Sequence, residues 1–357
     1  TATVAVSLDI EKAFDTTWFE GLILKLRNFG YPRTLCSIAY QFLKDRTFQV
    51  RVHDKLSETF RVSAGVPQGS KLGPKLYNIY TVDAPAPPDG KVKRLCYADD
   101  LLIYTHSRIA STASRRLNSY LARLGEYFTK WKIKINANKI VAIALAMRHP
   151  LKYPEDLDLR FGNERIPIQD SMKYLGVHFT PKMNFVKHVS ETRKKVIGQS
   201  KYLHNALRHS NLLSPQIKTL CYKQLLRPII AYAFPIYSCM SSSQMEKLRI
   251  LERKTLRRCI NYERRLDGTH HPVKYLYEQA NTPRLDDFLI SIGLRYLDRI
   301  RDTENQLVRN SCLLNPQLVE RLRIKPPQYL ENFRDIDDDV IPLYNRGFRD
   351  PAYRVYL

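Results

Sequence analysis

The amino-acid sequence predicts an α+β domain followed by an all-α domain. Before about residue 180, segments in which apolar residues alternate are interleaved with segments in which apolar residues recur at helical spacing. After about residue 184, only the helical spacing remains. Mixed strands and helices followed by helices alone are typical of two folding units. We therefore expect a domain boundary at residues 180–184.

The chain begins with a predicted buried strand and two predicted helices. Residues 3–10 alternate and are rich in Val and Ile, so we expect a strand that ends at Asp9. The first helix is predicted from apolar residues that share one face, namely Trp18, Leu22, Leu26 and Phe29. The Gly-Tyr-Pro stretch at 30–32 ends this helix. A second helix is expected at 33–44.

The next segment predicts a hairpin, a loop and a third helix. Residues 47–63 alternate around a polar turn at 53–55, which indicates a β-hairpin. Residues 65–74 contain several Gly and Pro and open a helix near 71–82. The Pro-rich tract at 84–90 is predicted to be a linker.

An acidic pair interrupts the following apolar segment. Residues 95–104 are apolar on both sides of this pair, which predicts two short strands joined by a tight turn with Ala98-Asp99-Asp100 at its tip. The remaining elements expected in this domain are a long helix at 108–131 and strand-like segments at 133–147 and 174–179.

The charge of the chain indicates a polyanionic partner. Lys and Arg together number 58 against 35 Asp and Glu, which gives a net charge of +23 and a pI near 9.7. Between Lys182 and Arg265 the ratio of basic to acidic residues is higher still, with 18 basic residues against 4 acidic ones. Nucleic acid is the first candidate. The alternative is a basic protein whose charge only aids solubility.

The cysteine pattern and the lack of long apolar runs indicate the cellular environment that we expect for the protein. The six cysteines form no C-x-x-C pair, so neither a zinc knuckle nor a disulfide framework is indicated. No apolar run approaches the roughly 18 residues needed to cross a bilayer, and no signal-peptide pattern opens the chain. We expect a soluble, intracellular protein without a membrane partner. Because Thr1 leads straight into a strand, we also expect a segment of a longer protein.

Three carboxylates on hydrophobic strands are the candidate chemical site. Asp9 ends one apolar strand, and Asp99 and Asp100 lie in an apolar hairpin. Buried or adjacent carboxylates are unfavourable without a cation. If the two strands lie side by side, Asp9 and Asp99 can hold two divalent ions for phosphoryl or nucleotidyl transfer. Hard oxygen ligands of this kind select Mg²⁺ or Mn²⁺.

These residues lie in blocks that resemble a known family. Three blocks in order resemble motifs A, B and C of reverse transcriptases: AVSLDIEKAFD (5–15), AGVPQGSKLGP (64–74) and YADD (97–100). Two further blocks resemble motif D and the primer-grip motif E: WKIKINANKI (131–140) and MKYLGVHF (172–179). The segments 225–239 and 245–259 resemble the thumb of non-LTR (LINE-type) retrotransposon polymerases, nearest to the jockey group. The resemblance covers the chain up to about residue 300.

The resemblance implies a domain layout. It implies a polymerase palm over residues 1–180, with an antiparallel sheet and packed helices, and a basic helical thumb over residues 184–265. A mostly helical extension is expected over residues 266–357. Within the thumb, the resemblance and the basic clusters together suggest nucleic-acid contacts at Arg193, Lys194, Lys195, Arg253, Lys254, Arg257 and Arg258. The alternative for each of these residues is a solvated charged face.

The resemblance also implies catalytic roles. Asp9 and Asp99 are similar to the ligands of two Mg²⁺ ions, with Mn²⁺ as a possible substitute, and Asp100 to the third carboxylate. The Ile10 carbonyl is expected as a further ligand. Lys139 is expected to donate a proton to the leaving pyrophosphate. The residue after this lysine is Ile140, where the family commonly has threonine.

The resemblance also implies contacts with the nucleotide and the primer. Phe14 is expected to close the sugar pocket and so to exclude the ribose 2′-hydroxyl. Gln68 and Gly69 are expected to lie near the incoming nucleotide. The primer-grip residues are expected to be Tyr174, Leu175 and Gly176.

The function expected from the resemblance is RNA-directed DNA synthesis on an RNA template and a DNA primer, with dNTPs as substrates. One alternative is a decayed or domesticated polymerase that only binds RNA. A second is an RNA polymerase of the viral type, which usually has a polar residue at the place of Phe14. The resemblance implies work in the nucleus, with a cytoplasmic RNA–protein particle as an alternative.

Overall fold

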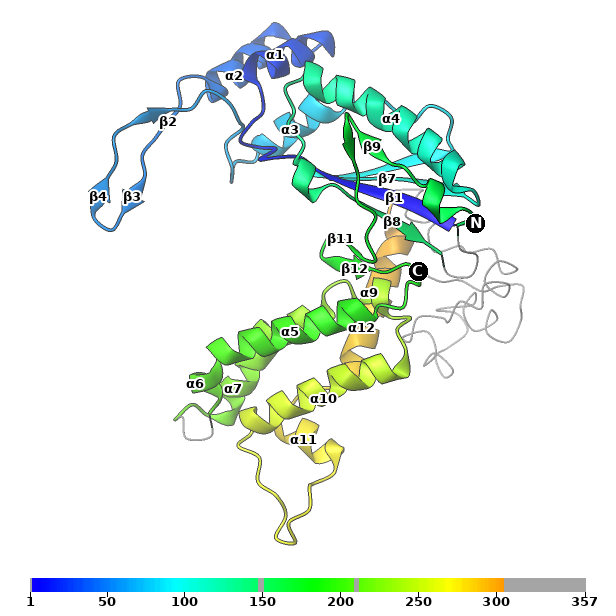
Figure 1. Cartoon of the computed structure of the whole chain (residues 1–357). Coiled ribbons are helices and arrows are strands. Elements are labelled where there is room, and N and C mark those ends of the chain that lie inside the picture. Colours follow the sequence, from blue (N-terminus) through cyan, green and yellow to red (C-terminus); the bar gives the residue numbers. More distant parts are fainter. Residues whose placement is uncertain (1, 147–150, 209–211, 305–357) are drawn as a thin grey trace. The chain divides into compact units, whose positions relative to one another are not determined.

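The computed structural model describes residues 2–146, 151–208 and 212–304 (Figure 1). The chain divides into two compact units, the first ending at Met183 and the second beginning at Asn184. The first unit contains strands and helices, whereas the described part of the second is helical. The predicted fold class, α+β followed by all-α, is confirmed.

A four-stranded antiparallel sheet forms the centre of the first unit, with the strand order β6-β7-β1-β8. These strands are β1 (Ala2–Asp9), β6 (Val92–Tyr97), β7 (Asp100–Ser107) and β8 (Val141–Leu145). The long helix α4 (Ala110–Lys130) covers one face of the sheet (Figure 1). The strand predicted to end at Asp9 and the hairpin predicted around 98–100 are therefore both present.

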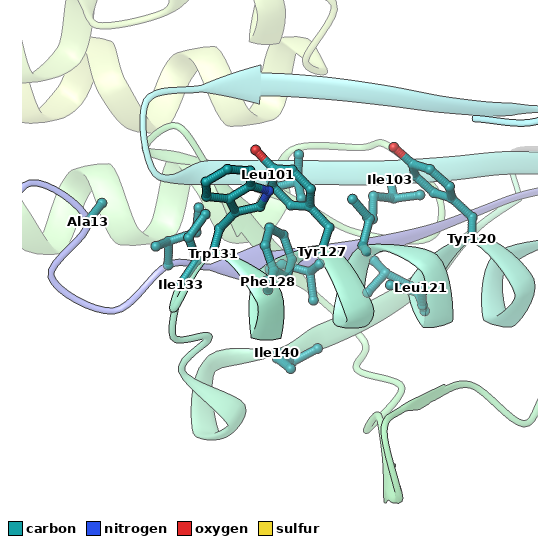
Figure 2. Packing of buried hydrophobic residues seen from close by; sticks show 14 of the residues in the cluster. Ala13, Leu101, Ile103, Tyr120, Leu121, Tyr127, Phe128, Trp131, Ile133 and Ile140 are labelled. Carbon is teal, nitrogen blue, oxygen red and sulfur yellow. The ribbon is translucent and has the colours of Figure 1, made fainter. Parts of the chain in front are cut away.

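The face of the sheet under α4 is the main hydrophobic core. Apolar residues of α4 recur at helical spacing and are buried: Leu117, Tyr120, Leu121, Leu124 and Phe128. They pack against Leu101 and Ile103 of β7 (Figure 2) and against Val4, Val6 and Leu8 of β1. Burying each large apolar side chain contributes roughly 1.5–3 kcal/mol. This layer therefore fixes the sheet to α4.

The opposite face of the sheet carries a smaller apolar cluster. Its buried members are Ala5, Ile143 and Met172, the last of which belongs to a second hairpin. This hairpin consists of β11 (Met172–Tyr174) and β12 (Val177–Phe179). Because side chains alternate along a strand, Asp9 shares this face with Ala5. The same alternation in β7 places Asp100 on this face, away from α4.

Three helices complete the first unit: α1 (Phe19–Asn28), α2 (Arg33–Leu43) and α3 (Gly73–Thr81). In α1, Leu22 and Leu26 are buried as predicted, but Phe29 lies beyond the helix end and is 43% exposed. Gly30 follows with a positive φ of 78°, which ends the helix.

A buried lysine joins α1, α3 and α4. Lys25 Nζ donates to Asp83 Oδ1 at 2.5 Å and to the Tyr127 hydroxyl at 2.6 Å, and it also donates to the Tyr80 carbonyl. The Trp131 ring lies 3.9 Å from the same nitrogen. Burial lowers the pKa of Lys25, and the hydrogen bond and charge of Asp83 oppose that shift. These contacts offset the cost of burying the ammonium group.

The hairpin predicted at 47–63 is present but is not buried. It consists of β2 (Thr47–Phe48), β3 (Arg51–Val52), β4 (Lys55–Leu56) and β5 (Phe60–Arg61). Its apolar side chains are 41–61% exposed: Phe48, Val50, Val52, Leu56 and Phe60. The alternation therefore reflects pairing of the two arms with each other, including stacked rings of Phe48 and Phe60 at 5.4 Å.

The strand predicted over residues 133–147 is mostly wrong. Only β8 is a strand in this stretch, and Ile135 makes a single bridge to Ile10. Asn136 donates to the Asp9 carbonyl at 2.9 Å, and the chain then enters the short helix η1 (Ala137–Lys139). Met147 lies outside the described residues. The other short elements of this unit are η2 (Pro154–Asp156), β9 (Arg160–Phe161) and β10 (Glu164–Arg165).

The second unit consists of helices in its described part. They are α5 (Val186–Tyr202), α6 (His204–Leu207), α7 (Pro215–Cys221), the π-helix η3 (Tyr222–Leu226), α8 (Arg227–Ala231), α9 (Phe234–Tyr237), α10 (Ser242–Cys259), α11 (Val273–Gln279) and α12 (Leu285–Asp302). Among the described residues, no helix is both long and apolar enough to cross a membrane.

A buried ionic network ties α10 to segments that lie before and after it in the chain. The Glu252 carboxylate accepts hydrogen bonds from the hydroxyls of Tyr222 and Tyr277 and lies 3.5 Å from Arg227 Nη2. Arg227 in turn donates to Thr282 Oγ1 at 2.9 Å. Helix α11 packs against α10 within the second unit, and the division drawn from the sequence near residue 265 stays a prediction. Residues 305–357 of the predicted extension lie outside the described residues.

Candidate active site

The antiparallel register brings the three predicted carboxylates to one end of the sheet. Asp9, the last residue of β1, lies directly opposite Asp100, the first residue of β7. Directly opposite residues in such a pair have Cβ atoms roughly 4.5–5.5 Å apart. Asp99 precedes Asp100 in the turn, and its carbonyl accepts a hydrogen bond from the Ile10 amide at 3.4 Å. Residues distant in the sequence thus form one acidic cluster.

The turn between β6 and β7 holds Asp99 at its tip. Tyr97 pairs with Asp100, so Ala98 and Asp99 form the connection. Ala98 has a positive φ of 53°. A non-glycine residue in this region costs roughly 1–2 kcal/mol and persists only where surrounding structure enforces it. The two apolar strands on either side supply that constraint.

The cluster is electrostatically unfavourable by itself. Burial raises the pKa of Asp100, and the negative charges of Asp99 and Asp9 raise it further. The charges of Lys139 and Lys173 oppose the shift. Like charges placed directly opposite each other on a sheet destabilise it. The site therefore favours an additional cation.

Lys139 is the nearest cation of the cluster. The turn at η1 brings its Nζ to 2.9 Å from Asp9 Oδ2. This hydrogen bond, together with the charge of Asp9, raises the pKa of Lys139. The lysine side chain is 62% exposed, so the pair is screened by solvent and the lysine can reorient.

The donor chemistry of the cluster fits hard divalent cations. Carboxylate oxygens are the ligands that Mg²⁺ and Mn²⁺ prefer, and the mutual repulsion of the acids is only partly offset by Lys139. Within residues 2–146, 151–208 and 212–304, no three Cys, His, Asp or Glu side chains are grouped closely enough to hold a metal ion. The carboxylates therefore fit such ions by type and charge, and their side chains do not form a completed cage.

The loop before α3 is bonded to the turn that follows β1. Val66 donates to the Phe14 carbonyl at 2.7 Å, and Gly65 donates to the Thr17 carbonyl at 2.8 Å. Gln68 Nε2 donates to Asp15 Oδ1 at 2.7 Å. Gln68 and Gly69 are both exposed in this loop. Two of the predicted motifs are thus joined as one structural piece beside the acidic cluster.

Phe14 lies half-buried in the turn after β1. Its ring centroid is 4.8 Å from that of Tyr77 in α3, with an angle of 41° between the ring planes. Its backbone is fixed by the bond from Val66. The ring is therefore held both by its main chain and by an aromatic neighbour.

The β11–β12 hairpin also lies near the acids. Leu175 and Gly176 form its turn, with φ values of 44° and 81°, as expected of a two-residue hairpin connection. Burial raises the pKa of Tyr174, and the charge of Asp100 contributes to that shift. The Lys173 charge in turn acts on Asp100. The predicted primer-grip residues are therefore placed within electrostatic reach of the cluster.

The basic residues predicted in the second unit fall into two groups. Four of them are exposed: Lys194, Lys195, Lys254 and Arg258. The others are partly buried, and Arg253 donates to Glu246 while the Arg257 guanidinium lies 5.5 Å from the Tyr262 ring. Lys194 also pairs with Glu191 at 2.8 Å.

Four residues near the cluster had no role in the sequence interpretation. Asp15 accepts from Gln68, and Arg46 donates to the Gly65 carbonyl. Lys173 acts on the charge of Asp100, and Tyr77 contacts Phe14. Asp15 and Lys173 lie inside recognised blocks (5–15 and 172–179), which is a signal that could have drawn attention to them. Arg46 and Tyr77 offered no such signal, because their contacts depend on tertiary packing.

The chain is similar in sequence to known proteins. Residues 1–179 match the family described as reverse transcriptase (RNA-dependent DNA polymerase). The chain is 30% identical over 314 residues to the RNA-directed DNA polymerase from mobile element jockey of Drosophila melanogaster, an alignment that covers 86% of this chain and 33% of the relative. It is 28% identical over 329 residues to the probable RNA-directed DNA polymerase from transposon BS of the same fly, covering 90% and 35%.

The chain thus spans about a third of the length of these relatives. Among solved structures, telomerase from Candida albicans aligns with 90% of this chain and 51% of its own, at 9% identity and a TM-score of 0.34, which is too low to bear on the fold. The family match extends from β1 to the end of β12 and so includes all three carboxylates. The chain belongs to the reverse transcriptase family, within the jockey-like group of non-LTR retrotransposon polymerases.

Proposed function

We propose that this chain is the catalytic core of an RNA-directed DNA polymerase that adds deoxynucleotides to a primer 3′-hydroxyl. The observation that carries the proposal is the pairing of Asp9 with Asp100 on one face of the sheet, with Asp99 in the adjoining turn. Membership of the reverse transcriptase family supports this assignment. The sheet would be the floor of a polymerase palm, and the helical second unit would be the thumb.

Divalent metal ions are a general feature of the family. Asp9, Asp99, Asp100 and the Ile10 carbonyl would hold two Mg²⁺ ions, or Mn²⁺ in their place, whose chemistry is to activate the 3′-hydroxyl and neutralise phosphate charge. Lys139 would turn from Asp9 toward the leaving pyrophosphate and donate a proton to it. Its exposure leaves the side chain able to turn, and a lysine ammonium is protonated near neutral pH.

The residues around the carboxylates would bind the nucleotide and the two strands. Gln68 and Gly69 would lie along the incoming dNTP, where the absence of a side chain at Gly69 permits close approach. The turn at Tyr174, Leu175 and Gly176 would hold the primer end. Basic residues of the second unit would bind template and primer phosphates: Arg193, Lys194, Lys195, Arg253, Lys254, Arg257 and Arg258. Among them, the exposed residues are the stronger candidates, because they are not engaged by the helix core.

Primer extension by the complete protein tests this function. On an RNA template with a DNA primer and Mg²⁺, we expect incorporation of dNTPs, loss of all incorporation when EDTA removes the metal, and recovery when Mg²⁺ or Mn²⁺ is restored. Binding of the template in a gel-shift assay without extension would instead favour an RNA-binding module. Equal use of rNTPs and dNTPs would favour an RNA polymerase.

Replacing Phe14 by alanine is expected to relax sugar selection. The ring occupies the volume that a 2′-hydroxyl would need, and loss of a steric barrier of this kind is worth roughly 10- to 100-fold in discrimination. The measurement is the ratio of kcat/KM for a dNTP to that for the matching rNTP. Phe161→Ala is the matched control, because Phe161 is also half-buried but packs on Phe128 of α4. An unchanged ratio in Phe14→Ala would remove Phe14 from the sugar pocket.

A further inference from the structure

A buried tyrosine beneath Phe14 has a hydroxyl group that the packing does not use. Tyr77, in α3, is 2% exposed, and its ring packs against the ring of Phe14 at 4.8 Å. Its hydroxyl oxygen is buried and has no hydrogen-bond partner within the described part of the chain. Buried hydroxyls in folded proteins are normally hydrogen-bonded, so this exception needs an explanation.

A second buried tyrosine on the same helix shows the usual arrangement. Tyr80 lies one turn further along α3, is equally buried, and donates its hydroxyl to the Trp131 carbonyl. Its ring also forms an edge contact with the Trp131 ring. The two tyrosines thus share helix, burial and side-chain type, and they differ in whether the hydroxyl has a partner. The structure of α3 itself therefore does not account for the hydroxyl of Tyr77.

The surroundings of Tyr77 connect it to the acidic cluster. Burial raises the pKa of Tyr77, and the negative charge of Asp99 is the next contribution. The phenol is therefore near enough to the Asp99 carboxylate to sense its charge, and its ring contacts Phe14 in the turn after β1. A buried phenol donor that has no partner forms a charge-assisted hydrogen bond when a carboxylate comes within reach.

The start of α3, one turn before Tyr77, is fixed to the loop that carries Gln68. α3 begins at Gly73, where a Cβ atom would lie 2.6 Å from the Pro67 carbonyl oxygen. Ser70 Oγ donates to the same carbonyl and accepts from the Gly73 amide at 2.9 Å. The start of α3 and the loop thus form one rigid piece, and Tyr77 projects from the next turns of that helix. A side chain on a backbone fixed in this way can hold the position of a neighbouring side chain to within a fraction of an ångström.

We propose that Tyr77 is a positioning residue for nucleotide selection. Its ring supports the Phe14 ring against the incoming sugar, and its hydroxyl donates a hydrogen bond to the Asp99 carboxylate when a nucleotide occupies the site. The proposal rests on the proposed function, because it takes Phe14 as the residue that closes the sugar pocket. The proposal gives the ring and the hydroxyl separate roles, and each role can be tested by its own substitution.

The ring is tested by Tyr77→Leu in the complete protein. We expect the ratio of kcat/KM for dNTP to that for rNTP to fall about tenfold, because the unsupported Phe14 ring can yield to a 2′-hydroxyl. Tyr80→Leu is the control, since it empties an equally buried tyrosine site on the same helix without touching Phe14, and it should leave the ratio unchanged. If Tyr77→Leu lowers the Tm too far for assay, Tyr77→Met, which keeps more of the volume without a planar ring, is used instead. A wild-type ratio in the folded variant overturns the role of the ring.

The hydroxyl is tested by Tyr77→Phe, which keeps the ring. We expect sugar discrimination to be retained and kcat for dNTP incorporation to fall about tenfold, the loss expected for one hydrogen bond to a charged group. Tyr80→Phe is its control and should retain kcat. An unchanged kcat in Tyr77→Phe overturns the role of the hydroxyl.

The outcome for Tyr77 is distinguishable from the outcome for the proposed function. Extension by the wild-type protein and relaxed discrimination in Phe14→Ala establish the function independently of Tyr77. If the wild-type protein binds nucleotides but does not extend a primer, the function fails, and the ratio of dissociation constants for dNTP and rNTP then replaces the kinetic ratio. In that case a tenfold smaller preference in Tyr77→Leu still supports the role of the ring, and an unchanged preference overturns it.

Discussion

Replacing Asp99 by alanine is expected to abolish primer extension, with the rate of dNTP incorporation falling by a factor of about 1,000 or more. Asp99 lies at the tip of the β6–β7 turn, beside the pair formed by Asp9 and Asp100. In the proposed mechanism two carboxylates would remain, too few to fix two divalent ions beside the primer end and the triphosphate. Single-turnover primer extension, with and without excess Mg²⁺, measures the loss.

The Asp99→Ala variant should still fold and bind template. The side chain is half-buried and is not a member of the hydrophobic core of the described residues, and its removal also relieves repulsion on Asp100, whose pKa should fall toward its ordinary value. Circular dichroism and a gel-shift assay check both points. Asp89→Ala removes the same charge from the exposed Pro-rich connection between α3 and β6 and should extend primers at the wild-type rate. Full extension by Asp99→Ala would contradict the assignment of the acidic cluster as the catalytic centre.

The strands that carry the acids could be predicted from their apolar alternation. In β1 and β7 apolar side chains alternate onto the face under α4, and Asp9 and Asp100 stand where each strand ends or begins. The sequence therefore located Asp9 at a strand end and Asp99 at a turn. The register between β1 and β7 could not be predicted from the sequence. Asp9 and Asp100 lie directly opposite each other because two segments distant in the chain pair, and no local pattern specifies that pairing.

The features that the sequence did not predict depend on tertiary partners. A lysine at helical spacing is normally interpreted as solvated, yet Lys25 is buried because Asp83, Tyr127 and Trp131 converge on it from elsewhere in the chain. The alternation at 47–63 predicted strands correctly but gave no information on their exposure. Apolar residues near 133–140 suggested a strand, whereas backbone bonds to the end of β1 bend that segment into η1. In that case a tertiary contact overrides the local pattern, and it brings Lys139 to Asp9.

Replacing Gly65 by alanine is expected to lower kcat/KM for dNTP incorporation about 100-fold. Gly65 has a φ of 92°, and a Cβ atom there would lie 2.6 Å from the Asp15 carbonyl oxygen and 2.7 Å from the Asp15 Cα. Both atoms belong to the backbone of the turn after β1, so neither can move without shifting Phe14. The loop that carries Gln68 must therefore separate from that turn, and a displacement of about 1 Å in a site of this kind can reduce the rate about 100-fold.

The effect of Gly65→Ala should exceed what backbone strain alone produces. Gly90 also has a positive φ, 64°, but a Cβ atom there would meet nothing within 4 Å. Gly90→Ala therefore reproduces the conformational penalty, about 1–2 kcal/mol, without the clash. Both variants should lose stability in urea denaturation, whereas only Gly65→Ala should lose activity, because only that substitution pushes apart the two segments that we propose face the nucleotide. Equal activity of the two variants would mean that the bonded contact between the loop and the turn after β1 is not needed to align Phe14 and Gln68 with the substrate.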